Sequence, residues 1–89
     1  MYFAVKDVKP IDDYKLLLTF ENGEQRCFNM KPFLDKGIFR ELQKLSVFKT
    51  VRLSFDTIVW INEADIDPEI LYDNSIIINE SIESNQPNL

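Results

Sequence analysis

The sequence contains no histidine and a single cysteine, Cys27. Histidine is the commonest general base and the commonest transition-metal ligand near neutral pH, so its absence argues against both kinds of chemistry. One cysteine without a histidine partner makes neither a zinc site nor an activated nucleophile, and we interpret Cys27 as a small apolar filler in a strand. A lone cysteine cannot form a disulfide within the chain, which favours a reducing compartment.

Glycine and long apolar runs are also scarce. Only Gly23 and Gly37 are present, so no glycine-rich phosphate-binding loop is expected. No stretch approaches the roughly 20 apolar residues that a membrane-spanning helix needs. The first residues lack the basic region and apolar run of a secretion signal. We therefore predict a cytoplasmic protein without a membrane association.

Positive charge is missing from the C-terminal third of the chain. Up to Arg52 there are ten Lys and Arg against seven Asp and Glu, whereas from Leu53 onward there are eight Asp and Glu and no Lys or Arg. The net charge is −5. Because an acidic segment repels phosphate backbones, we expect no direct contact with nucleic acid, and a basic protein surface would suit it better. A solvated acidic face that maintains solubility is the alternative.

Apolar and aromatic residues are plentiful enough for one compact core. The 89 residues are 45% hydrophobic and include seven Phe, three Tyr and one Trp. We assign a single domain to residues 1–75 and a C-terminal extension to residues 76–89. In the extension, Ile76-Ile77-Ile78 reads as a short edge strand that pairs either with the parent sheet or with another molecule. A mobile polar tail is expected over residues 79–89.

A β-hairpin is predicted around Asn22-Gly23, between the apolar segments 14–20 and 25–30. A two-residue loop would scatter apolar side chains over both faces. A turn with Gly23 as a left-handed bulge pairs Leu16 with Phe28 and is favoured, because it gathers the apolar residues on one face: Tyr14, Leu16, Leu18, Phe20, Phe28 and Met30. An N-terminal strand precedes the hairpin and is expected to end near Pro10.

The middle of the chain alternates between helical and strand patterns. One helical turn is expected to start at Pro32, followed by a helix over residues 38–45 with a buried stripe of Ile38, Leu42 and Leu45. Residues 48–55 alternate as in a strand with inward Val51, Leu53 and Phe55, and residues 58–61 form the next strand.

The acidic residues around Pro68 predict a helix start. Asp67 can cap the helix, Pro68 suits its first position, and Ile70 and Leu71 are expected to face the core. A calcium loop counted from Asp65 would need Gly sixth and Glu twelfth, and the chain has Ile at both positions. We therefore predict neither a metal site nor a cofactor.

The candidate interaction surface comprises the acidic residues of this region and one tryptophan, namely Glu63, Asp65, Asp67, Glu69, Asp73 and Trp60. Among apolar neighbours, Trp60 is most simply a core residue. A solvent-facing Trp60 would instead mark a binding patch.

Several features occur in one order along residues 2–75: the strand at Tyr14–Phe20 with Asn22-Gly23-Glu24, the Gly37-Ile38-Phe39 stretch, Phe48, Trp60 and the run Ala64-Asp65-Ile66-Asp67-Pro68-Glu69-Ile70-Leu71-Tyr72. Their order resembles the bacterial family called domain of unknown function 2442. The resemblance implies an α+β fold with an antiparallel sheet and no established activity. Some relatives carry a further helix-turn-helix domain, which is not expected within these 89 residues, and some are encoded beside suspected toxin–antitoxin proteins. Where the family typically has glycine, this chain has Glu63.

The predicted fold is therefore α+β, with a small antiparallel sheet in the order β-β-β-α-β-β-α, two short helices and two layers. The predicted function is a non-catalytic binding module, either an accessory to a small basic protein or an antitoxin-like partner, acting as a monomer or as a homodimer through a sheet edge. The alternative is a metal or small-molecule sensor with carboxylates at Asp65 and Asp67. DNA binding as a dimer conflicts with the charge.

Overall fold

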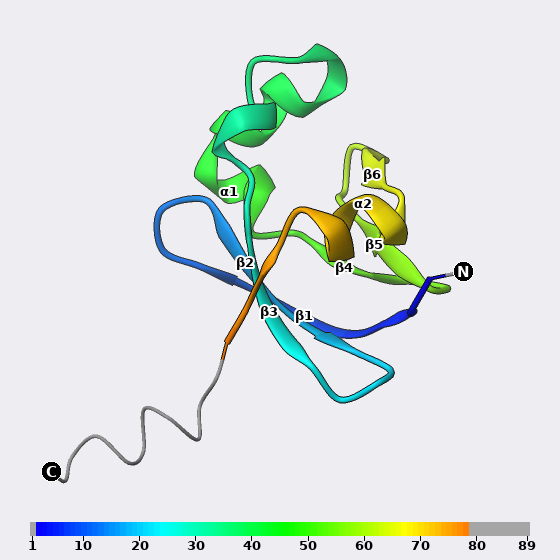
Figure 1. Cartoon of the computed structure of the whole chain (residues 1–89). Coiled ribbons are helices and arrows are strands. Elements are labelled where there is room, and N and C mark those ends of the chain that lie inside the picture. The colour runs from blue at the N-terminus through cyan, green and yellow to red at the C-terminus, as the bar shows by residue number, and fades with distance from the viewer. Residues whose placement is uncertain (1, 79–89) are drawn as a thin grey trace, which may run out of the picture.

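The computed structural model describes residues 2–78, so the predicted tail at residues 79–89 lies outside the described residues. The strands form two antiparallel sheets (Figure 1). The larger sheet has the order β1-β2-β3-β7, with β1 at Val5–Ile11, β2 at Lys15–Phe20, β3 at Gln25–Asn29 and β7 at Ile76–Ile77. The smaller sheet has the order β4-β5-β6, with β4 at Arg52–Ser54, β5 at Thr57–Val59 and β6 at Asp65–Ile66.

Helical segments connect and cover the sheets. The 3-10 helices η1 and η2 span Lys31–Phe33 and Gly37–Gln43, and the α-helices α1 and α2 span Leu45–Phe48 and Pro68–Asp73. In Figure 1, η1, η2 and α1 gather on one side of the molecule and α2 lies beside the small sheet. The predicted α+β class is confirmed, and the strands divide between two sheets.

The β2–β3 hairpin has the predicted register. Leu16 pairs with Phe28, and Gly23 lies in the left-handed region at φ +89°. Alternation along these strands points one set of side chains into the core, and Leu16, Leu18, Phe20, Phe28 and Met30 are buried there. The bulge was therefore the correct choice between the two turns.

The N-terminal strand is longer than predicted, because β1 runs through Pro10 to Ile11. Pro10 pairs in register with Leu16 of β2. β1 is an edge strand of its sheet, and proline is tolerated there because an edge residue can do without a ladder donor on its free side.

The predicted helix over residues 38–45 is wrong in type, and of its predicted buried stripe only Leu42 is buried. The segment forms η2 and then α1, with Lys44 in an extended conformation between them. A 3-10 helix has three residues per turn, so residues spaced by three share a face, and Phe39 and Leu42 turn towards the core. Ile38 and Leu45, spaced for an α-helix, are exposed.

The strand predicted over residues 48–55 is also shorter than expected. Phe48 belongs to α1 and is buried, and only Arg52–Ser54 form β4. Leu53 and Phe55 are exposed rather than inward. Phe55 lies in the turn between β4 and β5 at φ +58°, so the strand alternation ends before it.

The helix start at Pro68 is confirmed. Asp67 is the N-cap of α2, where its Oδ1 accepts a hydrogen bond from the backbone N–H of Glu69 at 2.8 Å. Pro68 and Leu71 are buried, whereas Ile70, predicted to face the core, is exposed.

The C-terminal isoleucines pair within the chain. Ile76 lies opposite Cys27 and Ile77 lies opposite Arg26, so β7 extends the larger sheet. This resolves the two alternatives for the extra strand in favour of the parent sheet.

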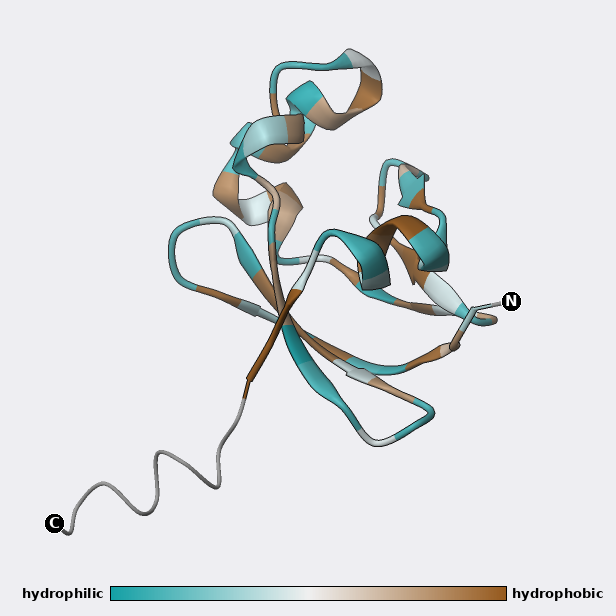
Figure 2. Ribbon diagram, viewed as in Figure 1, coloured by the Kyte–Doolittle hydropathy of each residue, from teal (hydrophilic) through white to brown (hydrophobic). Residues whose placement is uncertain are grey.

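A single core fills the space between the sheets and helical segments, and apolar residues recur along the strands and helices that surround it (Figure 2). Trp60 is fully buried in it, and its Nε1–H donates a hydrogen bond to the carbonyl oxygen of Phe48 at 2.9 Å. Phe39 and Phe48 surround the indole, each with a ring-centroid distance of 6.4 Å. Burial with a satisfied indole N–H makes Trp60 a core residue.

The same loop occurs twice in the fold, at residues 20–24 and 60–64. In each, the first backbone N–H donates to the carbonyl of the fifth residue, the fourth N–H donates to the first carbonyl, and the asparagine at the third position accepts from the fifth N–H. The fourth position is left-handed in both loops, and it holds Gly23 in one and Glu63 in the other, at φ +71°. Glu63 therefore stands where a residue without a Cβ is favoured.

Replacing Glu63 with glycine is expected to stabilise the protein by about 0.5 kcal/mol, because relief of left-handed strain exceeds the added entropy of the unfolded chain. Chemical denaturation of Glu63→Gly and the wild type would measure the difference. Gly23→Glu is the matched control in the loop at residues 20–24, where a Cβ meets no atom within 4 Å. It should destabilise the protein, because it places a side chain at a left-handed backbone position. Shifts of the same sign in both variants would contradict this account.

Candidate functional site

The N-terminal residues and the β4–β5 turn meet at one corner of the molecule. The Tyr2 hydroxyl donates a hydrogen bond to the Asp56 carboxylate, and the Val5 backbone N–H donates to the Asp56 carbonyl at 3.0 Å. On the other side of the N-terminal segment, the Ala4 N–H donates to the Glu21 carboxylate at 3.1 Å. We define the aromatic–acidic corner by Tyr2, Phe3, Glu21, Phe55, Asp56 and Asp67.

Phe55 is the most exposed large apolar residue of the described chain, with its side chain entirely in solvent. It is the first residue of the two-residue turn between the paired Ser54 and Thr57, a position where glycine is favoured when φ is positive. Holding a bulky residue there costs about 1–3 kcal/mol, and such strain often accompanies a functional site. Phe55 is therefore exposed and strained, and it contributes nothing to the core.

Asp67 reaches the corner because β6 runs antiparallel to β5. Ile66 pairs with Ile58, and the Thr57 hydroxyl donates to the Ile66 carbonyl, so the start of α2 lies beside the β4–β5 turn. Asp67 is exposed while it caps α2. One of its carboxylate oxygens accepts the capping hydrogen bond, and the side chain still presents its negative charge at the corner.

The negative charge of the corner affects the pKa of the Tyr2 hydroxyl. The hydrogen bond to Asp56 raises the pKa of the Tyr2 hydroxyl, and the charges of Asp56, Asp67 and Glu21 raise it further. Negative charges nearby disfavour the phenolate. Tyr2 therefore stays a hydrogen-bond donor that holds the turn, and the surrounding field attracts cations.

The residues of the predicted interaction surface do not form one patch in the structure. The five acidic side chains, Glu63, Asp65, Asp67, Glu69 and Asp73, are exposed, and no ion pair is formed by any of them among residues 2–78. Glu63 lies in the β5–β6 loop, at the opposite end of β5 from the corner, and only Asp67 belongs to the corner. Trp60 is buried in the core, which confirms the simpler interpretation of this residue and removes it from the candidate interaction surface.

Most of the corner was missed by the sequence reasoning. Tyr2 and Asp56 are 54 residues apart, and no local pattern announces their contact. Phe55 was assigned to the core because it continues an alternating pattern. The adjacent Asp56, a common turn residue, was the only available signal that the strand ends there.

The family comparison agrees with the resemblance noted in the sequence. The family model described as "Protein of unknown function (DUF2442)" matches residues 5–76, which is most of the chain. The chain belongs to the DUF2442 family. No curated protein and no solved structure matches it. None of the helices among residues 2–78 has the length and apolar character needed to cross a bilayer.

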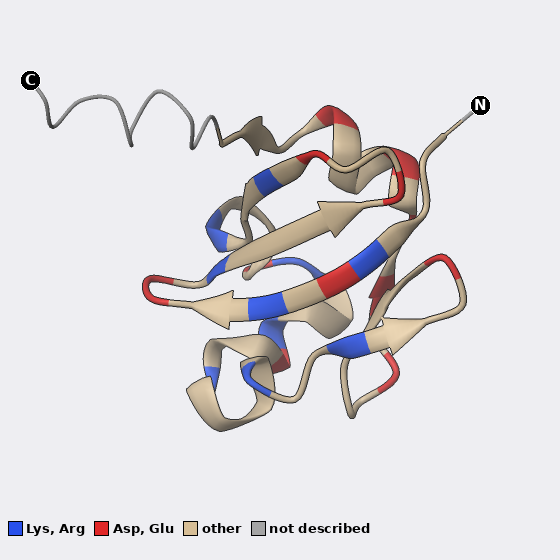
Figure 3. Ribbon diagram, turned by 90° about the horizontal axis from the view of Figure 1, so that it is seen from below, with Lys and Arg blue, Asp and Glu red and all other residues tan. Residues whose placement is uncertain are grey.

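Charge is unevenly spread over this DUF2442 domain. Figure 3 shows alternating basic and acidic segments along β1, whereas α2 carries acidic segments only. No Lys or Arg follows Arg52 in the sequence, so β5, β6 and α2 contain no basic residue, and Arg52 of β4 is the one basic residue of the small sheet. The described residues contain no group of three or more acidic, cysteine or histidine side chains placed to hold a metal ion.

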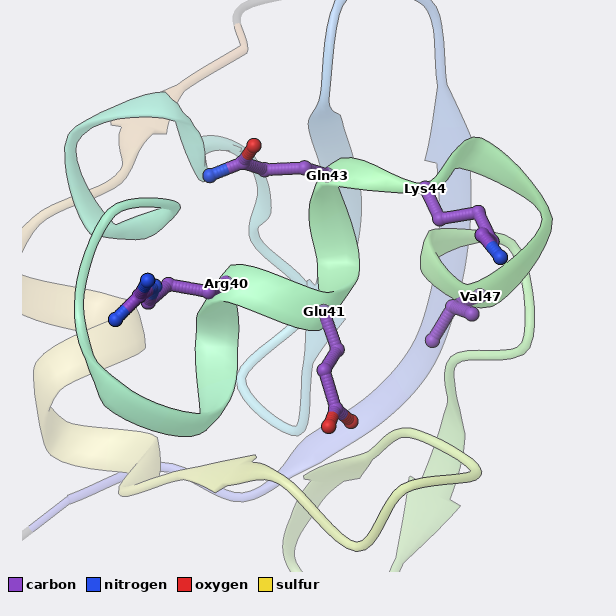
Figure 4. A pocket seen from close by; sticks show the side chains of 5 residues that line it. All are labelled: Arg40, Glu41, Gln43, Lys44 and Val47. Atoms are coloured by element: carbon purple, nitrogen blue, oxygen red, sulfur yellow. The ribbon is translucent and has the colours of Figure 1, made fainter.

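A surface hollow of about 430 Å³ lies on the helical side of the DUF2442 domain, lined by Arg40, Glu41, Gln43, Lys44 and Val47. Figure 4 shows Arg40, Glu41 and Lys44 pointing in different directions from the backbone. Gln43 donates to the Leu34 carbonyl at 2.7 Å, and Glu41 accepts from Asn62 at 2.7 Å. These polar groups serve local contacts and do not converge on one point in the hollow.

A polar cluster joins β3 to the connection between α2 and β7. Arg26 forms an ion pair with Glu24 at 2.7 Å and donates to the hydroxyl and carbonyl oxygens of Ser75 at 2.9 and 3.2 Å. Its guanidinium lies 4.1 Å from the centre of the Tyr72 ring, and the Tyr72 hydroxyl donates to Glu24 at 2.8 Å. Every charged member has a partner, so the cluster is structural.

Because of this cluster, the free energy of unfolding is expected to depend on pH in the acidic range. Hydrogen bonds from Tyr72 and Arg26 lower the pKa of Glu24 below its ordinary value of 4.5. A lowered folded-state pKa gives a contribution that is complete above the ordinary value and is lost as the pH falls below it. We therefore expect the free energy of unfolding to fall below about pH 4.5 less steeply in Glu24→Gln than in the wild type.

Urea denaturation between acidic and neutral pH would measure these slopes. Asp73→Asn, at an exposed carboxylate without an ion pair among residues 2–78, is the control for loss of one charge. If the free energy of unfolding falls equally steeply with decreasing pH in Glu24→Gln and in the wild type, the role assigned to Glu24 is contradicted.

Proposed function

We propose that this protein is a non-catalytic interaction module that binds a basic segment of a partner protein at the aromatic–acidic corner. The observation that carries the proposal is the fully exposed Phe55, held in a strained turn next to Asp56, with Asp67 near the adjoining Tyr2. An exposed aromatic ring flanked by carboxylates can bind a Lys or Arg side chain by cation–π contact and by ion pairing.

The corner is built to present Phe55 rigidly. The turn is held on one side by strand pairing of Ser54 with Thr57, and on the other by the contacts of Asp56 with Tyr2 and Val5. A preorganised anchor loses little conformational freedom on binding, so more of its contact energy appears as affinity. Aromatic anchors of this kind are typical binding hot spots.

The other exposed carboxylates support association over a longer range. Glu63, Asp65, Glu69 and Asp73 lie in the β5–β6 loop, β6 and α2, and no Lys or Arg follows Arg52 in the sequence. Complementary charge speeds the encounter with a basic partner and disfavours acidic ones, including nucleic acids. A small basic cytoplasmic protein, such as a toxin neutralised by this chain, has the required chemistry.

The alternative of a carboxylate sensor at Asp65 and Asp67 gains less support. Asp67 is engaged as the cap of α2, and Asp65 lies in β6 opposite Val59. A hard cation prefers several oxygen ligands that converge on one point, and residues 2–78 contain no such grouping of acidic side chains.

The test compares Phe55→Ser with the wild type in affinity capture from the native host, followed by calorimetric titration of each captured protein after purification. We expect a basic protein whose affinity falls at least about ten-fold in Phe55→Ser, the loss typical of a hot-spot residue. Affinity should also weaken with added salt, because the carboxylates act through screened charge.

Ile38→Ser is the matched control, since Ile38 is an exposed apolar residue of η2 and is not part of the corner. It should bind like the wild type. Failure to find any protein that the wild type binds and Phe55→Ser binds more weakly would refute the proposal, and so would equal weakening by the two variants.

A further inference from the structure

Among residues 2–78, the outer edge of β7 has no pairing partner. The Ile78 N–H donates to the Gln25 carbonyl at 2.8 Å, and Ile76 lies opposite Cys27. In an antiparallel ladder, alternate residues point their backbone groups to opposite sides, so the N–H and C=O of Ile77 point away from β3. No described strand pairs with β7 on that side.

This edge also lacks the features that usually prevent pairing. Ser75 to Ile78 contain no charged residue and no proline, whereas the opposite edge strand, β1, contains Lys6, Asp7, Lys9 and Pro10. Ile76 is 74% exposed and Ile77 is 51% exposed. In Figure 2, β7 is a strongly apolar strand on the outside of the fold. Natural edge strands normally carry charges, prolines or bulges that block association.

We propose that β7 pairs with β7 of a second copy of this chain, in an antiparallel arrangement centred on Ile77. The two Ile77 residues would exchange two backbone hydrogen bonds across a two-fold axis, and Ile76 would face Ile78 of the second copy. The two four-stranded sheets then form one continuous sheet of eight strands. Closed two-fold symmetry limits the assembly to a dimer.

The uncharged edge, which is complementary to itself in an antiparallel pairing, favours a second copy as the occupant. The chain has a net charge of −5, and its acidic corner and α2 would repel the same surfaces of another copy. At the β7 edge, two copies meet through uncharged residues, and the pairing brings isoleucine against isoleucine. A basic partner has no complementary charge at this edge, so the dimer is independent of the proposed binding at the corner.

The size of the contact sets the expected strength. Only Ile76 to Ile78 are available among the described residues, so the interface is smaller than the roughly 1,200 Å² at which stable complexes begin. We therefore expect a weak dimer, as is typical of small transient interfaces.

Sedimentation equilibrium on the full chain, between about 10 µM and about 1 mM, covers dissociation constants that correspond to weak binding. The mass should rise from 10.5 kDa towards twice that value with concentration. Ile77→Pro removes only the outward N–H, leaves the pairing with β3 intact and should stay monomeric. Ile77→Val keeps the N–H and is the control that should still dimerise.

A second measurement guards against a folding defect in the proline variant. In a Cys27→Ser background, Ile77→Cys places the two thiols opposite each other on the axis, at a Cα separation of about 5.5 Å that suits a disulfide. Air oxidation should give a covalent dimer, and Ile61→Cys in the same background should not. A wild type that stays monomeric at the highest concentration, an Ile77→Pro variant that still dimerises, or the absence of a cross-link at position 77 would overturn the proposal. Binding at the corner is tested by Phe55→Ser, so the two proposals fail separately.

Discussion

Replacing Trp60 with alanine is expected to lower the free energy of unfolding by about 4 kcal/mol, the cost of a large cavity in a packed core. Trp60 is fully buried, and its loss also leaves the Phe48 carbonyl without the indole N–H that donates to it at 2.9 Å. A domain of this size has a total stability of roughly 5–10 kcal/mol, so the variant would lie close to unfolding. Urea denaturation followed by circular dichroism measures the change.

Phe55→Ala is the matched control, because it removes another large aromatic side chain from a fully exposed position. Its free energy of unfolding should remain within about 0.5 kcal/mol of the wild type, as is usual for surface substitutions. Similar losses in the two variants would contradict the placement of Trp60 in the core and of Phe55 on the surface.

Replacing Arg26 with methionine is expected to cost about 2–3 kcal/mol, because hydrogen bonds to a charged group are strong and their loss leaves half-buried acceptors unpaired. Glu24 would lose its ion pair, and the Ser75 hydroxyl and carbonyl would lose their donor. Ser75 is buried just before β7, so the attachment of β7 to β3 should weaken first. Amide hydrogen exchange at residues 75–78 and urea denaturation would measure the two effects.

Arg52→Met is the control for removing one positive charge, since Arg52 is exposed on β4 and forms no ion pair among residues 2–78. It should change the free energy of unfolding by no more than about 0.5 kcal/mol. A loss of under about 1 kcal/mol in Arg26→Met would show that the cluster is held by other contacts, since charged hydrogen bonds are worth more than this.

The parts of the fold that depend on short-range rules were predicted well. Gly23 and the alternation of the flanking residues determine the register of the β2–β3 hairpin, since only one turn type buries the apolar set. Asp67 and Pro68 specify the start of α2 through local capping. In both places the residues that decide the structure are neighbours in the sequence.

Other parts depend on contacts between distant residues and were not predictable in this way. The segment at residues 37–48 has helical periodicity, but burial of Phe39, Leu42 and Phe48 against the core favours a 3-10 helix and a separate α-helical turn. The corner depends on the approach of Tyr2 to Asp56, and the polar cluster depends on the approach of Arg26 to Ser75. Pairing of β7 with β3 likewise joins residues that are 49 positions apart at Cys27 and Ile76.

The late position of β7 in the chain has a consequence for synthesis on the ribosome. β3 follows β2 directly, yet its second neighbour is not made until residues 76 and 77 have emerged from the exit tunnel. Until then, the growing chain displays β3 as an open sheet edge, with Cys27 in its centre. A nascent chain that pauses before Ser75 is therefore the form most exposed to aggregation and to oxidation at that cysteine.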